Sequence, residues 1–233
     1  MINVVYEDNH LIIVSKASGE IVQGDKTGDR PLSEDVKQYI KEKYAKPGNV
    51  FLGVVHRLDR PVSGLVLFAR TSKALPRLNK MFAGGEIHKT YWAITASLPE
   101  AVADVHDASW HKAVHWLVRN EKQNKSYAYD HEVPNSKRAE LDYRLIGRSD
   151  RYFLLEINLK TGRHHQIRCQ LAKLGAPIKG DLKYGAKRSN PDGSISLHAR
   201  SMQFCHPVGG NEIHVEAPLP TDMLWERIKG LKS

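Results

Sequence analysis

The chain is poor in cysteine and has no long apolar run. Its 233 residues include two cysteines, Cys169 and Cys205, too few and too isolated for a disulfide framework or a zinc finger. No stretch approaches the roughly 18 apolar residues of a membrane-spanning helix. The first residues have neither the basic start nor the apolar segment of a signal peptide. The sequence therefore predicts a protein of the reducing cytoplasm that does not enter a membrane.

A metal-binding motif is also missing. His111 and His115, in the irregular segment from Pro99 to Pro134, have an i, i+4 spacing that would place both on one helix face. No Glu follows the first histidine, as an H-E-x-x-H motif requires, and the acidic residues do not cluster as metal ligands would. We therefore expect no metal site.

Positive charge exceeds negative charge. The 35 Lys and Arg against 26 Asp and Glu give a formal net charge of +9, which favours a polyanionic partner such as a nucleic acid. The length allows one large domain or two lobes sharing a cleft. Because no linker, repeat or low-complexity segment is visible, we predict a single domain over residues 1–233.

A loop rich in charge lies between two apolar runs. Residues 56–64 read His-Arg-Leu-Asp-Arg-Pro-Val-Ser-Gly, and the flanking runs 51–55 and 65–69 are typical of short buried strands. Desolvating so many charges is costly, so the loop lies in a wet cleft or pairs Asp59 with Arg57 or Arg60. A carboxylate kept ionised at a strand end is a candidate nucleophile.

Periodicity predicts helices and antiparallel strands around this loop. One helix begins near Ser33 and carries Val36, Ile40 and Tyr44, and a second, capped by Thr71 or Ser72, runs to Gly84. Short apolar runs or alternating apolar residues predict strands at 4–6, 11–14, 86–96, 127–129, 139–145 and 152–159, the last two forming an antiparallel hairpin.

A third helix follows the last of these strands. Ile167, Leu171 and Leu174 have helical spacing before Gly175, which leaves His164, His165 and Arg168 for the other face. A strand begins near residue 197, and a short helix is expected between 221 and 229. The fold class is therefore α+β, with a mixed, largely antiparallel sheet flanked by helices.

Five ordered motifs resemble the catalytic domain of the RluA-type RNA pseudouridine synthases. They are His56-Arg57-Leu58-Asp59-Arg60 with Ser63-Gly64, Lys89-Thr90-Tyr91, Thr161-Gly162-Arg163 with His165-Gln166-Ile167-Arg168, Gly180-Asp181 with Tyr184-Gly185, and Leu197-His198-Ala199. The resemblance implies a bent sheet with a central RNA-binding cleft. It implies no S4-like or other appended domain, because only the opening strands precede the first motif. The sequence departs from the family at Pro61-Val62 and lacks the usual Asn-Lys-Pro start around Lys16.

The resemblance implies isomerisation of uridine to pseudouridine in RNA without a cofactor. Asp59 matches the family's catalytic aspartate, which attacks C6 of the base or acts at the ribose through an acylal or glycal route; the residues do not choose between them. Arg168 matches the basic residue that pairs with this aspartate. Tyr91 matches the tyrosine that stacks on uracil and serves in proton transfer from C5.

RNA binding is expected from a wider set of residues. Arg57 is expected to fill the space of the flipped base or to hold an adjacent phosphate, and a structural salt bridge is the alternative for it. The full set expected at the RNA is Arg57, His56, Arg60, Lys89, Arg163, His165 and Lys179. The partner is ribosomal or transfer RNA, and we expect a monomer with no obligatory protein partner.

Two other function classes remain open from the residues. A module of the same fold that binds RNA without catalysis is one, although Asp59, Tyr91 and Arg168 are all present. A metal-dependent nucleic-acid hydrolase is the other, and the dispersed acidic residues disfavour it.

Overall fold

A computed structural model describes residues 2–25, 27–102 and 104–230. Its elements, in chain order, are β1 Asn3–Glu7, β2 Leu11–Lys16, α1 Leu32–Lys43, β3 Gly53–Val54, β4 Ser63–Ala69, α2 Ala74–Gly84, β5 His88–Thr95, β6 His111–Asn120, β7 Lys125–Tyr129, β8 Lys137–Arg148, β9 Phe153–Leu159, α3 Gln166–Lys173, the 3-10 turn η1 Leu182–Tyr184, β10 Leu197–Cys205, β11 Glu212–Glu216 and α4 Met223–Gly230. In these ranges no helix has the length and apolar character needed to span a bilayer.

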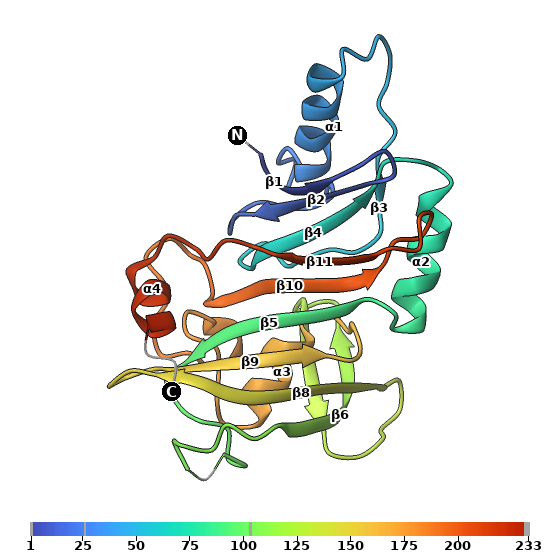
Figure 1. The fold of residues 1–233 in the computed structure, drawn as a ribbon. Coiled ribbons are helices and arrows are strands. Elements are labelled where there is room, and N and C mark those ends of the chain that lie inside the picture. Colours follow the sequence, from blue (N-terminus) through green and yellow to red (C-terminus); the bar gives the residue numbers. More distant parts are fainter. Residues whose placement is uncertain (1, 26, 103, 231–233) are drawn as a thin grey trace. The chain divides into compact units, whose positions relative to one another are not determined.

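The chain, whose elements are labelled in Figure 1, divides into two compact units. The first contains the residues up to His88 together with Ala199–Pro218, and the second contains Lys89–His198 together with the residues from Leu219 onward. Both combine antiparallel strand pairs with helices, so the predicted α+β class is confirmed. One catalytic domain over residues 1–233 stays a prediction.

In the first unit, β2 pairs antiparallel with β1 on one side and with β4 on the other. Alternate residues of β2 and β4, such as Leu11 and Leu67, join a core with α2 and with β10 and β11. The intervening residues, such as Ile12 and Phe68, are also fully buried. Burial on both faces explains why these strands read as continuous apolar runs instead of alternating ones.

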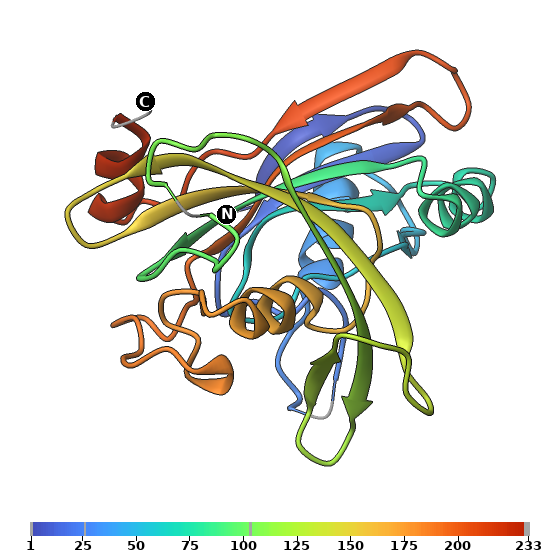
Figure 2. The same cartoon turned by 90° about the horizontal axis from the view of Figure 1, so that it is seen from below.

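The second unit is built on the strand order β5-β9-β8-β6-β7. Helix α4 packs Trp225 and Ile228 against Trp92 of β5, on one face of this sheet. Helix α3 lies on the opposite face (Figure 2), where Cys169 contacts Ala139 of β8. The two helices thus bury the two faces that a pleated strand presents with a period of two.

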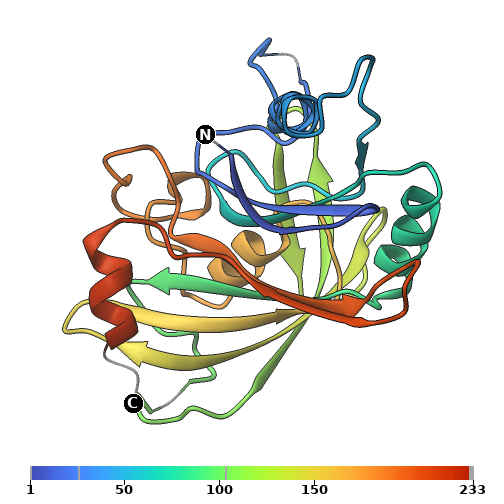
Figure 3. The same cartoon turned by 45° about the horizontal axis from the view of Figure 1, so that its top comes forward.

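Helix α1 (Figure 3) is the predicted helix, but its apolar stripe is shorter than expected. Val36 and Ile40 are fully buried, as expected, but Tyr44 follows the last helical residue and is 45% exposed. Its hydroxyl donates to Glu7 Oε1 at 2.8 Å, so a polar partner holds it at the surface. The helix begins at Leu32, and Ser33 is buried in its first turn instead of capping it. The prediction for Tyr44 was therefore wrong, whereas the helix begins within one residue of the predicted start near Ser33.

Helix α2 ends as predicted, with Gly85 in the left-handed conformation at φ +73°. The run 51–55 forms a strand only at Gly53–Val54, and Phe51 is 45% exposed. Among the residues that the structure describes, this strand pairs with the end of β4, at Ala69 and Phe68, and the rest of the run forms no strand.

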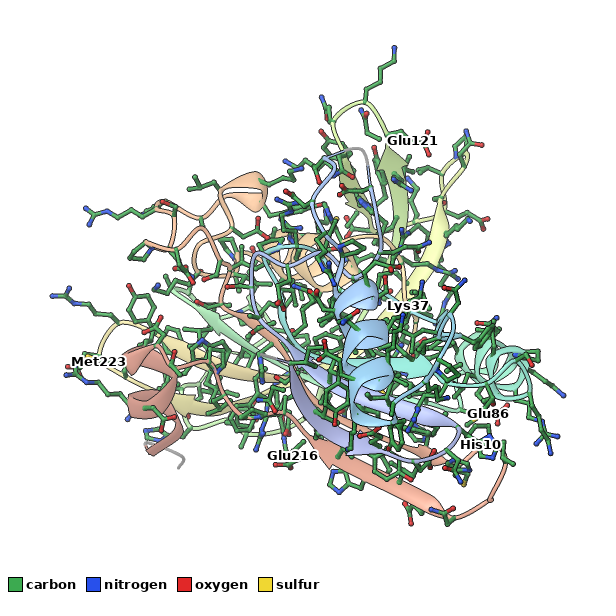
Figure 4. The ribbon with its side chains drawn as sticks, turned by 90° about the horizontal axis from the view of Figure 1, so that it is seen from above. His10, Lys37, Glu86, Glu121, Glu216 and Met223 are labelled. Carbon is green, nitrogen blue, oxygen red and sulfur yellow. The ribbon has the colours of Figure 1, made fainter. Side chains whose placement is uncertain are left out.

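The segment from Pro99 to Pro134 is more regular than expected. It contains the β6–β7 hairpin, whose turn carries Glu121, labelled in Figure 4. His111 and His115 therefore lie on a strand, and the idea that they share a helix face was wrong. The pairing of β6 with β8 stabilises this strand, and such a non-local partner is not visible in the local sequence.

Candidate active site

The loop that carries Asp59 is anchored by two apolar side chains. Leu58 and Val62 are buried, whereas Arg57 and Arg60 are exposed and Asp59 is half-buried. The Val62 N–H donates to the carbonyl oxygen of Asp59 at 3.0 Å and closes a turn around Arg60. Burial of Leu58 and Val62 thus anchors the loop around the half-buried Asp59.

Lys16 supports this loop from the end of β2, a role that the sequence reasoning missed. Its side chain is 1% exposed, and its Nζ donates to the carbonyl oxygens of Arg60 at 3.1 Å and Ala17 at 2.8 Å. Burial lowers the pKa of Lys16 to about 8, while the negative charges of Glu20 and Asp59 act in the opposite direction. The available signal was a lysine at the end of an apolar strand.

Two residues predicted to bind RNA have partners within the first unit. Arg60 forms an ion pair with Asp29, so its carboxylate partner is not the adjacent Asp59. His56 Nε2 accepts the backbone N–H of Leu67 at 2.9 Å, and its ring stacks on Phe82 with centroids 4.8 Å apart. The accepting Nε2 identifies a neutral imidazole that supports the loop.

In the second unit, Tyr91 lies on the sheet face that α3 covers. It pairs with Ile157, which pairs in turn with Tyr143, so these three side chains share a face. Trp92 points to the opposite face, toward α4. Tyr91 is 7% exposed. The strand register thus brings Tyr91 to the same face of the sheet as Arg168 of α3.

Arg168 is buried and has a carboxylate partner in its own unit. Its Nε and Nη2 atoms donate to Asp181 Oδ2 and Oδ1 at 2.7 and 2.9 Å. The Arg168 Cζ lies 5.1 Å from the ring centroid of Tyr184. Sequence reasoning named Asp181 and Tyr184 within a motif but gave neither a role. Pairing between Arg168 and Asp59 stays a prediction.

The loop before α3 is organised by Gln166. Its Oε1 accepts the hydroxyl of Thr161 at 2.8 Å and the backbone N–H of Arg163 at 2.9 Å. His165 precedes the helix in the left-handed conformation at φ +51°, so it and His164 lie before the helix and not on its face with Arg168. That part of the prediction was wrong, because the helix begins at Gln166, after both histidines.

His165 is held neutral. Burial, followed by the positive charge of Arg168, lowers the pKa of His165 to about 2. Its Nδ1 lies 3.0 Å from the Tyr184 hydroxyl, and its ring stacks on His164 with centroids 3.8 Å apart. A neutral, buried ring with these contacts is better suited to shape the loop than to bind phosphate.

The three remaining predicted RNA contacts differ in exposure. The Arg163 side chain is exposed, and its Nε donates to the carbonyl oxygen of Arg138 at 3.1 Å. Lys179 Nζ donates to Asn190 Oδ1 at 2.6 Å. Burial lowers the pKa of Lys89. Of these three residues, Arg163 is exposed, whereas Lys89 and Lys179 are half-buried.

The two candidate metal ligands contact different carboxylates. His111 Nε2 lies 3.1 Å from Asp107, and His115 Nε2 lies 3.9 Å from Asp130. In the part of the chain that the structure describes, no three His, Cys, Asp or Glu side chains gather as metal ligands would.

Comparison with known proteins places this chain in a family. A sequence profile of the family described as RNA pseudouridylate synthase matches residues 10–173, which include Asp59, Tyr91 and Arg168. The chain is 31% identical, over 239 residues, to the ribosomal large subunit pseudouridine synthase D of Xanthomonas campestris pv. campestris, and covers 67% of that protein. It is also 30% identical to the tRNA pseudouridine synthase C of Vibrio vulnificus. The aligned region covers 98% of this chain and 94% of that protein.

The fold agrees with these sequence matches. The human protein named RNA pseudouridylate synthase domain containing 4 superposes with a TM-score of 0.77 over 97% of this chain and 93% of that chain, at 21% identity. At 21% identity, this structural similarity is evidence of a shared fold alone. The profile match over most of the chain and the relatives at about 30% identity confirm the resemblance to RluA-type enzymes. The chain belongs to the RNA pseudouridylate synthase family, a family of isomerases.

Proposed function

We propose that this protein converts uridines in structured RNA to pseudouridine, with Asp59 as the nucleophile. The family match across residues 10–173 carries the proposal, because that range contains all three expected catalytic residues. The polyanionic substrate fits the net charge of +9. Ribosomal and transfer RNA are the substrate classes, in keeping with the names of the relatives from Xanthomonas and Vibrio. We extend the proposal to a monomer working in the cytoplasm.

The reaction breaks the bond from N1 to C1′ and forms a bond from C5 to C1′. The carboxylate of Asp59 attacks C6 of the base or acts at the ribose, and uracil turns in the site before the new bond forms. The proton on C5 is then lost and N1 ends protonated, so the overall change is an isomerisation. Tyr91 stacks on uracil and takes part in the transfer of the C5 proton, and Arg168 supplies positive charge to the reacting groups.

The target base must leave its stack to reach the carboxylate of Asp59 in the loop of residues 56–64. Flipping costs a few kcal/mol, which RNA contacts must offset. Arg57, two residues before Asp59 and exposed, is the side chain we assign to the vacated space. The exposed Arg60 and Arg163 are assigned to phosphates. Lys89 and Lys179 complete the RNA contacts of the proposal.

A tritium-release assay tests this function. Purified protein is incubated with ribosomal or transfer RNA carrying tritium at uridine C5, with and without a chelator. Wild-type protein should release tritium to water in both cases, and Asp59→Ala should release none. RNA binding without release would instead indicate a non-catalytic module, and strand scission would indicate a hydrolase. Carbodiimide mapping of the product would then identify the modified position.

A further inference from the structure

Asp181 holds the guanidinium of Arg168 along one edge. Two roughly parallel hydrogen bonds, of 2.7 and 2.9 Å, join the Arg168 Nε and Nη2 atoms to the two carboxylate oxygens. The side chains of Arg168 and Asp181 are 6% and 1% exposed. A two-point contact of this kind fixes both the position and the plane of the guanidinium. Nη1 lies outside this pair.

The turn that carries Asp181 is itself rigid. The Asp181 N–H donates to Ile178, and the Asp181 carbonyl oxygen accepts from Tyr184 and Ala186, each at 3.0 Å. Gly180 before it has φ +89°, and a Cβ there would lie 2.7 Å from the carbonyl oxygen of Ser194. Because the backbone is constrained on both sides, the carboxylate has little freedom to follow a moving arginine.

Tyr184 restricts the arginine from a second direction. Its ring centroid lies 5.1 Å from Arg168 Cζ, and its hydroxyl accepts the backbone N–H of Ser126 at 2.8 Å. The ring is therefore tied to β7 while its face contacts the cation. Two contacts of different kinds, an ion pair and a ring face, hold the same guanidinium.

We propose that Asp181 is a positioning residue that fixes Arg168 in its reactive orientation, with Tyr184 as the adjoining wall. This inference rests on the proposed function, in which Arg168 takes part in the reaction. A long arginine side chain has many rotamers, and ordering it before the substrate arrives removes that cost from the reaction itself. A buried ion pair contributes little net stability, so orientation explains the pair better than stability does.

Tritium release at saturating RNA tests the inference through kcat. Asp181→Asn keeps the shape of the side chain but removes its charge and one acceptor oxygen. We expect kcat to fall about 100-fold, as for a misplaced catalytic group, with KM for RNA changed less than about threefold. Asp192→Asn, an exposed acid in the following turn, is the matched control and should keep the wild-type kcat. Equal kcat for Asp181→Asn and wild type would overturn the inference.

A second variant covers a failure of Asp181→Asn to fold. Asp181→Glu keeps the charge but lengthens the side chain by one methylene, and should also lose kcat. In an Arg168→Lys background, Asp181→Asn should cost less than about threefold, because the guanidinium to be oriented is gone. A loss as large as in the wild-type background would show that Asp181 acts otherwise and would overturn the inference.

The orientation also has a spectroscopic readout that does not depend on activity. In ¹⁵N-labelled protein, the Arg168 Nε–H signal, assigned by its loss in Arg168→Lys, should exchange slowly with water. In folded Asp181→Asn it should exchange at least about tenfold faster, and an unchanged rate would count against the inference. Wild-type protein that releases no tritium would overturn the proposed function and this inference with it. If wild-type protein is active and Asp181→Asn is equally active, the inference is overturned but the proposed function is not.

Discussion

Lys16 Nζ donates a hydrogen bond of 3.1 Å to the carbonyl oxygen of Arg60, the residue after Asp59. The lysine is buried at the end of β2, so the bond joins a rigid strand to the middle of the loop. A charge-assisted bond to a backbone carbonyl holds that part of the chain more firmly than a neutral one. The loop's conformation therefore depends on a residue 44 positions before Arg60 in the chain.

Lys16→Met should destabilise the protein by about 2–4 kcal/mol, because the carbonyl oxygens of Arg60 and Ala17 lose a charged donor that is itself buried. Urea unfolding measures this change. Lys37→Met is the matched control: Lys37 lies on the outer surface of α1 (Figure 4), where it pairs with exposed Glu34, and should cost less than about 0.5 kcal/mol. Equal losses for the two variants would contradict the role of Lys16.

Gly64→Ala should destabilise the first unit by about 2–5 kcal/mol. Gly64 has φ +111°, and an added Cβ would lie 2.3 Å from the carbonyl oxygen of Ala199 in β10. Gly28→Ala is the control for backbone strain alone, because Gly28 has φ +78° and an added Cβ there would meet no other atom within 4 Å. We expect it to lower the free energy of unfolding by about 1 kcal/mol. Thermal or urea unfolding compares them, and a Gly64→Ala loss no greater than that of Gly28→Ala would refute the close contact.

His56→Leu should cost about 1–3 kcal/mol, because the Leu67 N–H loses the acceptor that His56 Nε2 provides at 2.9 Å. His56→Gln, whose Oε1 reaches a similar position, should recover most of this loss. If His56 supports the loop without touching RNA, KM for RNA in His56→Gln stays within about threefold of wild type. A tenfold rise in KM with normal stability would instead place His56 at the RNA.

His165 should make stability fall with acid. Its pKa is lowered to about 2 in the folded protein but is near 6.5 in the unfolded chain. Between these values the unfolded chain binds more protons, so stability decreases as pH falls below about 6.5, by at most about 1.4 kcal/mol per pH unit.

Urea unfolding at pH 7, 6 and 5 measures this dependence. His165→Asn is the matched control, since asparagine tolerates the left-handed backbone at φ +51° and does not titrate in this range. The variant should show a smaller loss between pH 7 and 5 than the wild type. The same pH dependence in both proteins would mean that His165 is not the group responsible.

Arg60→Gln should weaken RNA binding. The plot of the logarithm of the association constant against the logarithm of the salt concentration should become less steep by about 0.7–0.9, as expected for one lost phosphate contact. Arg30→Gln offers a close comparison, because Arg30 is also exposed and paired with an aspartate, Asp35. Filter binding across a salt series distinguishes them. Equal slopes for both variants and the wild type would remove Arg60 from the RNA contacts.

Some of the structure is determined by short-range sequence. The apolar spacing of Leu78 and Met81 before Gly85 specifies α2, and the alternation in β8 and β9 specifies their hairpin, because these periods match helix and strand geometry directly. The motif order identified the family and named Asp59, Tyr91 and Arg168 as its expected catalytic residues.

Other features were decided only by tertiary structure. Strand β6 forms because β7 and β8 pair with it. Strand β3 is short because its described pairing is with the end of β4. Likewise, Asp181 holds Arg168, and Lys16 supports the loop of Asp59. A sequence reports the period and chemistry of each segment. Which distant backbone or charge completes a buried hydrogen bond depends on how the folded chain brings those segments together.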